Sequence, residues 1–164
     1  MADDALLPFY SFDTSAIING MRDIFIPTTF RSIWDEIENM VATGQVRAVD
    51  EVKREIRRKS DEARAWAENC RGLFVPLDRE IQMATREVLA AHPRLMGKGG
   101  GQRNSADPFV IALALARGGT VVTQEQSASL TKPRIPDVCD AMGVPWQTLP
   151  AFVNYQGWQF SVGR

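Results

Sequence analysis

Short apolar runs that end at or near an acidic residue alternate along the chain with helical stretches, and this alternation limits the folds that it can adopt. The runs at 9–12, 45–49 and 120–123 are continuous in hydrophobicity rather than apolar at every second position, and a last strand is expected at 144–149. Continuous apolar strands are typical of parallel sheets that helices cover on both faces. The sequence therefore predicts an α/β fold, a three-layer α/β/α sandwich with a central parallel sheet.

Helical periodicity and breaker residues place helices between these strands. The expected helices cover 14–20, 33–43, 50–69, 78–91, 106–116 and 135–142. Thr14 or Ser15 is suited to cap the first helix, which we expect Gly20 to close. The stretch 106–116, capped by Asn104 or Ser105, is apolar on nearly every side, which predicts a central position in the fold.

Length and charge exclude several classes of protein. With 164 residues, 45% of them hydrophobic, the chain has the size of one domain with a real core. A formal net charge of −1 gives no global electrostatic attraction for nucleic acid or anionic lipid. The acidic start lacks a secretory signal and the longest apolar run stops at Arg117, so we expect a cytoplasmic protein without a membrane span. Two cysteines and one histidine support neither a disulfide framework nor a zinc site.

Acidic residues follow the expected strands at their carboxyl ends or stand in the next helical turn. They are Asp13, Glu51, Glu55, Asp107 and Glu125. In a parallel sheet these side chains converge on one edge, where ligand sites form. Carboxylates packed together raise one another's pKa unless a cation neutralises them, and Mg²⁺ or Mn²⁺ is the fitting ion for oxygen ligands.

Each of these features also has a purely structural interpretation. Asp13 can cap the helix that follows it, and Asp107 can stabilise the first turn of its own helix. Glu51 and Glu55 can belong to a solvated helix face. The basic run 53–59 is either such a face or a strip that binds an RNA backbone, and Lys98 and Arg103 in a glycine-rich loop can reach phosphates. That loop is no P-loop, because Lys98 is followed by glycine.

Four segments carry a resemblance to a known family. They are "FDTSAIING", "AVDEVKREI", "SADPFVIALALARGGTVVTQE" and "KPRIPDVCDAMGVPWQTLPAF", which together span nearly the whole chain. In order and spacing the chain resembles the PIN-domain superfamily of metal-dependent nucleases, and within it an uncharacterised bacterial family related to VapC-type toxins. The resemblance implies a single PIN-like domain over residues 1–164.

The resemblance also implies roles for the acids. Asp13 matches the first metal carboxylate and Asp107 the acid on the central helix. Glu55 best matches the acid after the second strand, with Glu51 one turn earlier as its rival. The fourth position is usually aspartate and is here Glu125, whose longer side chain favours contact with the metal through water.

Three hydroxyl residues match positions that orient the acids by hydrogen bonds in the family, namely Thr14, Ser15 and Thr123. The implied activity is hydrolysis of RNA phosphodiester bonds with Mg²⁺ or Mn²⁺, by the toxin of a bacterial toxin–antitoxin pair. RNA, an antitoxin protein and a second copy of the chain in a homodimer are the implied partners.

Two other functions remain open at the level of sequence. One is a PIN scaffold that has lost catalysis and binds RNA or protein, which Glu125 and the open choice between Glu51 and Glu55 both allow. The other is an aspartyl phospho-acceptor. A haloacid dehalogenase needs a second aspartate where Ser15 stands, and a receiver domain needs paired acids near the start and a lysine after a late strand, neither of which is clear.

Overall fold

A five-stranded parallel sheet forms the centre of the molecule. The computed structural model describes residues 6–96 and 106–162. The strand order is β3-β2-β1-β4-β5, and all four neighbouring pairs are parallel. The strands are β1 (Tyr10–Phe12), β2 (Val46–Val49), β3 (Phe74–Val75), β4 (Thr120–Val122) and β5 (Trp146–Gln147). The predicted α/β sandwich with a parallel sheet is confirmed.

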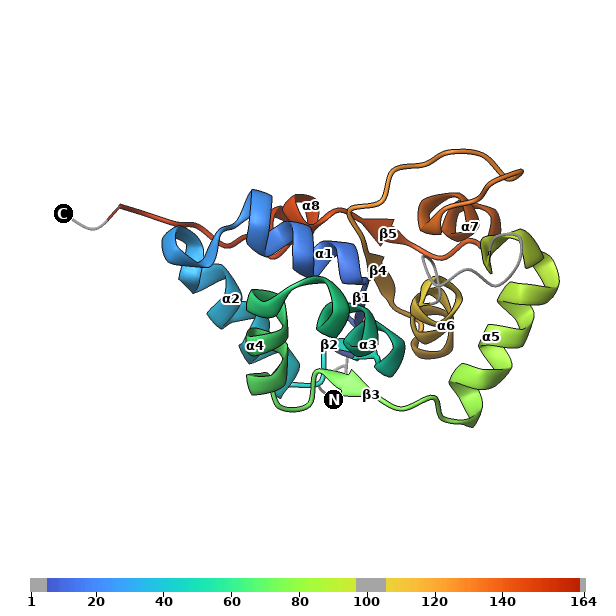
Figure 1. Ribbon diagram of the computed structural model, residues 1–164, viewed down its shortest axis with the longest axis horizontal. Helices are drawn as coiled ribbons and strands as arrows, with labels where there is room; N and C mark the ends of the chain where they lie inside the picture. Colours follow the sequence, from blue (N-terminus) through green and yellow to red (C-terminus); the bar gives the residue numbers. More distant parts are fainter. Residues whose placement is uncertain (1–5, 97–105, 163–164) are drawn as a thin grey trace, which may run out of the picture.

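Helices cover the sheet on both sides, as Figure 1 shows with α1, α2 and α4 to the left of the strands and α5, α6 and α7 to the right. The first four are α1 (Thr14–Asn19), α2 (Pro27–Ala42), α3 (Asp50–Lys59) and α4 (Asp61–Asn69). The next four are α5 (Arg79–Ala91), α6 (Asp107–Arg117), α7 (Ile135–Met142) and α8 (Leu149–Tyr155). A π-helix, η1 (Gly20–Ile24), continues α1, and a 3₁₀ turn, η2 (Pro93–Met96), follows α5.

The strand β1 lies in the middle of the sheet and fixes where the site forms. Ser11 pairs with Arg47 of β2 on one side and with Val121 of β4 on the other. The three strands therefore end at the same edge, and the residues that follow them lie close together. All three residues of β1 are buried, as expected for a strand covered on both faces.

The helix α6 packs against this central part of the sheet and contacts β1, β2 and β4. Val110, Ile111 and Leu113 are at most 1% exposed, which agrees with the predicted central helix that is apolar all round. It ends at Gly118, whose positive φ of 62° forms a left-handed cap. The N-cap position is Ala106, and the predicted caps Asn104 and Ser105 lie outside the described residues.

Several local predictions are wrong. The expected helix 50–69 is two helices, because Ser60 adopts extended backbone angles and its hydroxyl caps α4 by accepting from the Ala63 amide. Gly20 does not close α1 but continues into η1, where a Cβ atom would lie 2.6 Å from Leu149 Cδ2. Close packing, rather than a left-handed turn, explains that glycine. The strand β3 and the helix α8 were not expected.

Among the described residues, no helix is long and apolar enough to cross a membrane.

Candidate functional site

A pocket of about 350 Å³ opens at the sheet edge where β1, β2 and β4 end. Four acids from four different segments line it, namely Asp13, Glu55, Asp107 and Glu125. The other lining residues are Thr14, Ser15, Ile18, Asn19, Arg22 and Lys59. The structure thus brings together the four acids selected from the sequence, and their roles in binding or catalysis stay predictions.

Asp13 follows β1 directly and is 3% exposed. Its Oδ2 atom accepts hydrogen bonds from the Ser15 hydroxyl at 2.6 Å and from the Thr123 hydroxyl at 2.9 Å. Burial raises the pKa of Asp13, and these two hydroxyl bonds oppose the rise. Asp13 occupies the N-cap position of α1 but makes no capping bond with its side chain, so the capping interpretation does not account for this acid.

Glu55, on α3, is the acid from the second-strand helix that reaches the pocket. It is 3% exposed, and its Oε2 accepts from the Thr14 hydroxyl at 2.6 Å while its Oε1 accepts from the Ala106 amide at 3.2 Å. The rival Glu51 is not among the lining residues and pairs instead with Arg54 at 2.8 Å. One helical turn therefore separates a pocket acid from a surface ion pair.

Asp107 is the first residue of α6 and is 4% exposed. Its Oδ2 atom is buried and has no hydrogen-bond partner, a state shared by only one other side-chain atom of the described residues. Burial, followed by the charges of Asp13 and Glu125, raises the pKa of Asp107 to about 10. An orphaned carboxylate oxygen inside a protein costs free energy, and a cation would relieve that cost.

Glu125 lies three residues beyond the end of β4, and its backbone is held by a bond from its amide to Thr123 Oγ1. Its Oε2 atom accepts from the Ile135 amide at 3.0 Å, the first residue of α7. Burial and then the charge of Asp13 raise the pKa of Glu125. The longer side chain of this glutamate therefore reaches the backbone amide at the start of α7.

Carboxylate oxygens are the donors that Mg²⁺ and Mn²⁺ prefer, and the orphaned Asp107 oxygen fits such an ion. Within residues 6–96 and 106–162, no group of three or more His, Cys, Asp or Glu side chains is already arranged to hold a metal. The carboxylate donors of the pocket fit a divalent ion. In this structure Asp13, Glu55 and Glu125 accept hydrogen bonds from hydroxyl and amide groups.

The hydroxyl groups of Thr14, Ser15 and Thr123 each donate a hydrogen bond to an acid of the pocket. Ser15 and Thr123 also lie 3.2 Å apart and share Asp13, and the Ser15 hydroxyl accepts from the Gln124 amide at 2.9 Å. These bonds connect the end of β1 to the end of β4, which are neighbours in the sheet. The hydroxyl pair thereby fixes the Asp13 carboxylate from two strands at once.

Sequence reasoning did not single out Asn19 and Arg22, which also line the pocket. The signal was available, since Ser15, Asn19 and Arg22 recur at i, i+4 and i+7 on one helical face. Lys59 was part of the predicted basic run and is the residue of that run that reaches the pocket. The glycine-loop cations Lys98 and Arg103 lie outside the described residues.

The fold has a counterpart among solved structures. The crystal structure of VapBC2 from Rickettsia felis bound to a DNA fragment from their promoter matches with a TM-score of 0.51 and 9% sequence identity, over 85% of this chain and 98% of that chain. The likeness shows a PIN-like fold. No curated protein matches the sequence.

A family model covers most of the chain. It matches residues 10–160, from the first residue of β1 to beyond α8, and includes all four pocket acids. The chain therefore belongs to the family described as a domain of unknown function, DUF4411.

Proposed function

We propose that this chain is a Mg²⁺- or Mn²⁺-dependent endoribonuclease that hydrolyses RNA phosphodiester bonds. The observation that carries the proposal is the buried Asp107 oxygen without a partner, in a pocket shared with three more acids. Burial and the charges of its neighbours raise the pKa of Asp107, and carboxylates perturbed in this way inside a pocket are typical of functional sites. The PIN-like fold supports the same activity, and the toxin–antitoxin neighbour supports a toxin.

Asp13, Asp107, Glu55 and Glu125 are the proposed metal carboxylates. A divalent ion held there would supply charge neutralisation at the scissile phosphate and would activate a water as the nucleophile. Within the chain, Ser15 and Thr123 hold one oxygen of Asp13 and leave the other for the ion.

Two further contacts orient the remaining acids. The Thr14 hydroxyl and the Ala106 amide fix Glu55, and the Ile135 amide fixes Glu125. Asp107 has an oxygen free of hydrogen bonds and is the acid best placed to turn toward an ion without giving up a contact. Such outer contacts hold ligands in orientation, and their loss commonly weakens metal binding about 10- to 100-fold.

The test is cleavage of a mixed cellular RNA pool by the purified protein with Mg²⁺ or Mn²⁺, against EDTA and against Asp13→Asn and Asp107→Asn. Asp35→Asn is the matched control, since Asp35 is exposed on α2 and pairs with Arg31 at 3.9 Å. We expect discrete metal-dependent fragments from the wild type and the control, and none from the two pocket variants, with circular dichroism unchanged.

Absence of cleavage with either metal, together with no heat of metal binding in calorimetry, would contradict the nuclease. The chain would then be the scaffold that binds RNA or protein without catalysis.

We extend the proposal to a bacterial toxin–antitoxin pair, with an antitoxin protein and a homodimer as partners. The support is the VapBC2 neighbour, which is itself such a complex. Induced expression in a bacterial host should arrest growth for the wild type and not for Asp107→Asn. Light scattering should give twice the mass of one chain, and normal growth with the active wild type would exclude the toxin while leaving the nuclease intact.

A further inference from the structure

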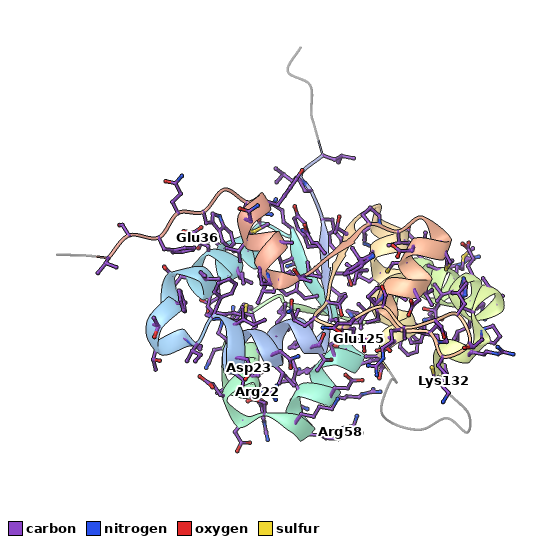
Figure 2. All side chains as sticks on the ribbon, turned by 90° about the horizontal axis from the view of Figure 1, so that it is seen from above. Arg22, Asp23, Glu36, Arg58, Glu125 and Lys132 are labelled. Atoms are coloured by element: carbon purple, nitrogen blue, oxygen red, sulfur yellow. The ribbon has the colours of Figure 1, made fainter. Side chains whose placement is uncertain are left out.

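Two cations line the acidic pocket together with the four acids, namely Arg22 on the π-helix η1 and Lys59 at the end of α3. Neither forms an ion pair with a pocket acid among the described residues. Figure 2 shows Arg22 beside Asp23 in the lower part of the view. Because no pocket acid pairs with either cation, each can contact an anionic ligand at the pocket.

The Arg22 guanidinium is held by a neighbour that is not in the pocket. Its Nε lies 3.0 and 2.9 Å from the two Asp23 carboxylate oxygens, and its Nη2 lies 2.6 Å from Asp23 Oδ2. Nη2 also lies 3.5 Å from Asn19 Oδ1. In the described part of the chain no hydrogen bond uses Nη1, so its two N–H groups can donate to a ligand.

The π-helix contributes to this placement. Its wider turn is closed by a bond from the Phe25 amide to the Gly20 carbonyl at 2.7 Å, and it carries Arg22, which lines the pocket after α1 has ended. Short π-helical turns occur frequently at functional sites, because they change the direction of side chains without ending the helix.

Lys59 differs from the other basic residues of its run. Three of these hold partners elsewhere: Lys53 lies 5.6 Å from the centre of the Phe74 ring, Arg54 pairs with Glu51, and Arg57 pairs with Glu68 at 3.5 Å. Lys59 is exposed, lines the pocket and makes no ion pair or hydrogen bond with the described residues. Its ammonium group is free to contact an anion at the pocket mouth.

We propose that Arg22 and Lys59 bind phosphate groups of a polynucleotide strand whose neighbouring phosphate enters the pocket, and that Asp23 is a positioning residue for Arg22. This inference rests on the proposed function for the choice of RNA. Four carboxylates repel a polyanion, so entry of a strand needs cations at the rim to offset that repulsion. Arginine with a free N–H pair suits the two oxygens of a phosphate, and lysine adds a point charge.

The test is fluorescence anisotropy of a short labelled single-stranded RNA, measured in EDTA so that the strand stays intact. Arg22→Gln and Lys59→Gln should each weaken binding about tenfold at low salt, the loss expected for one charged hydrogen-bonding contact. Each should also reduce the slope of log K against log salt by about 0.7. Arg86→Gln, an exposed arginine on α5 outside the pocket, is the control and should change neither quantity.

Asp23→Asn separates positioning from simple electrostatics by the sign of its effect. Removal of a negative charge should tighten binding of a polyanion if Asp23 acts only through its charge. If Asp23 orients Arg22, the same change should weaken binding about threefold, roughly 0.6 kcal/mol. Glu36→Gln, an exposed acid on α2, is the control for the charge alone and should leave binding unchanged or slightly tighter.

The inference is overturned if the wild type does not bind the strand, if the two cation variants bind like Arg86→Gln, or if Asp23→Asn tightens binding. Circular dichroism of each variant checks the fold, and all three changed side chains are exposed. The binding assay contains no metal, so it is independent of cleavage. Cleavage without the expected binding pattern would refute this inference alone, and the binding pattern without cleavage would refute the nuclease alone.

Discussion

The acids on the two sides of the pocket differ in how they are held. Asp13, after β1, receives two hydroxyl hydrogen bonds, whereas Asp107, at the start of α6, has a buried oxygen that receives none. Hydrogen bonds from the protein hold the Asp13 carboxylate in place. The buried oxygen of Asp107 has no such donor to stabilise a negative charge. The comparison indicates that hydrogen bonds preorganise the acid on the β1 side, whereas the acid on the α6 side has one oxygen without a polar contact.

The largest expected effect is on the pH dependence of stability. The pKa of Asp107 is raised to about 10, while in the unfolded chain it is near 4, so the folded protein holds a proton that the unfolded chain releases. The stability from this proton is present in full below about pH 4 and is lost as the pH rises toward 10. Asp107→Asn should flatten that decline and, at pH 8, raise the free energy of unfolding by about 1–3 kcal/mol.

Urea unfolding of the metal-free proteins from pH 4 to pH 9 measures this difference. In Asp107→Asn the free energy of unfolding should still fall somewhat with pH, because the pKa values of Asp13 and Glu125 are also raised. Asp35→Asn should follow the wild type. Parallel curves for Asp107→Asn and the wild type would show that Asp107 is stabilised as an anion after all.

The next effect is that of a divalent ion on the same unfolding curves. Mg²⁺ or Mn²⁺ at ten times its dissociation constant should add about 1.4 kcal/mol to the wild type at pH 8. The gain should grow with pH, because the ion binds deprotonated acids. Asp107→Asn should gain much less, and an equal gain in both proteins would place the ion away from the α6 side.

A hydroxyl deletion tests the preorganised side. Thr123→Val removes the donor to Asp13 and should lower metal affinity about tenfold and stability by about 1 kcal/mol. Titration calorimetry and thermal unfolding measure the two quantities. Thr29→Val, at an exposed position in α2, should change neither. Wild-type affinity in Thr123→Val would mean that Ser15 alone is enough to hold Asp13.

The smallest effect is expected for the rival acid. Glu51→Gln removes only a surface pair with Arg54, so stability should change by less than about 0.5 kcal/mol and cleavage should persist. Glu55→Gln should abolish cleavage, since it changes a buried acid of the pocket. Loss of cleavage in Glu51→Gln would reverse the assignment of the two glutamates.

Those parts of the fold that depend on pattern could be predicted from the sequence. The apolar character of α6 on all sides required a central helix, and the continuous apolar runs required a parallel sheet. A two-residue strand such as β3 has no periodicity to detect. The boundary between α3 and α4 at Ser60 could have been recognised, because a serine followed by two acids is typical of a helix start. The many charged residues around it made this pattern hard to detect.

The site was predictable in part for a related reason. Asp13 and Asp107 follow from their places at a strand end and a helix start. Glu55 could be preferred to Glu51 only through the family resemblance, because both stand on the same charged helix and burial of one depends on how α3 packs. The helical spacing of Ser15, Asn19 and Arg22 was a signal for Arg22, but no local sequence rule predicted the π-helical turn on which it lies.

The sheet order also governs when the pocket forms during synthesis. The Thr123 hydroxyl that holds Asp13 is 110 positions later in the chain, and Glu125 is made later still. At about 5–20 residues per second, a ribosome needs roughly 6 to 22 seconds between these two sides of the pocket. A nascent chain of this protein thus carries its first acid early and stays without the complete set of pocket acids until about three-quarters of its residues have been synthesised.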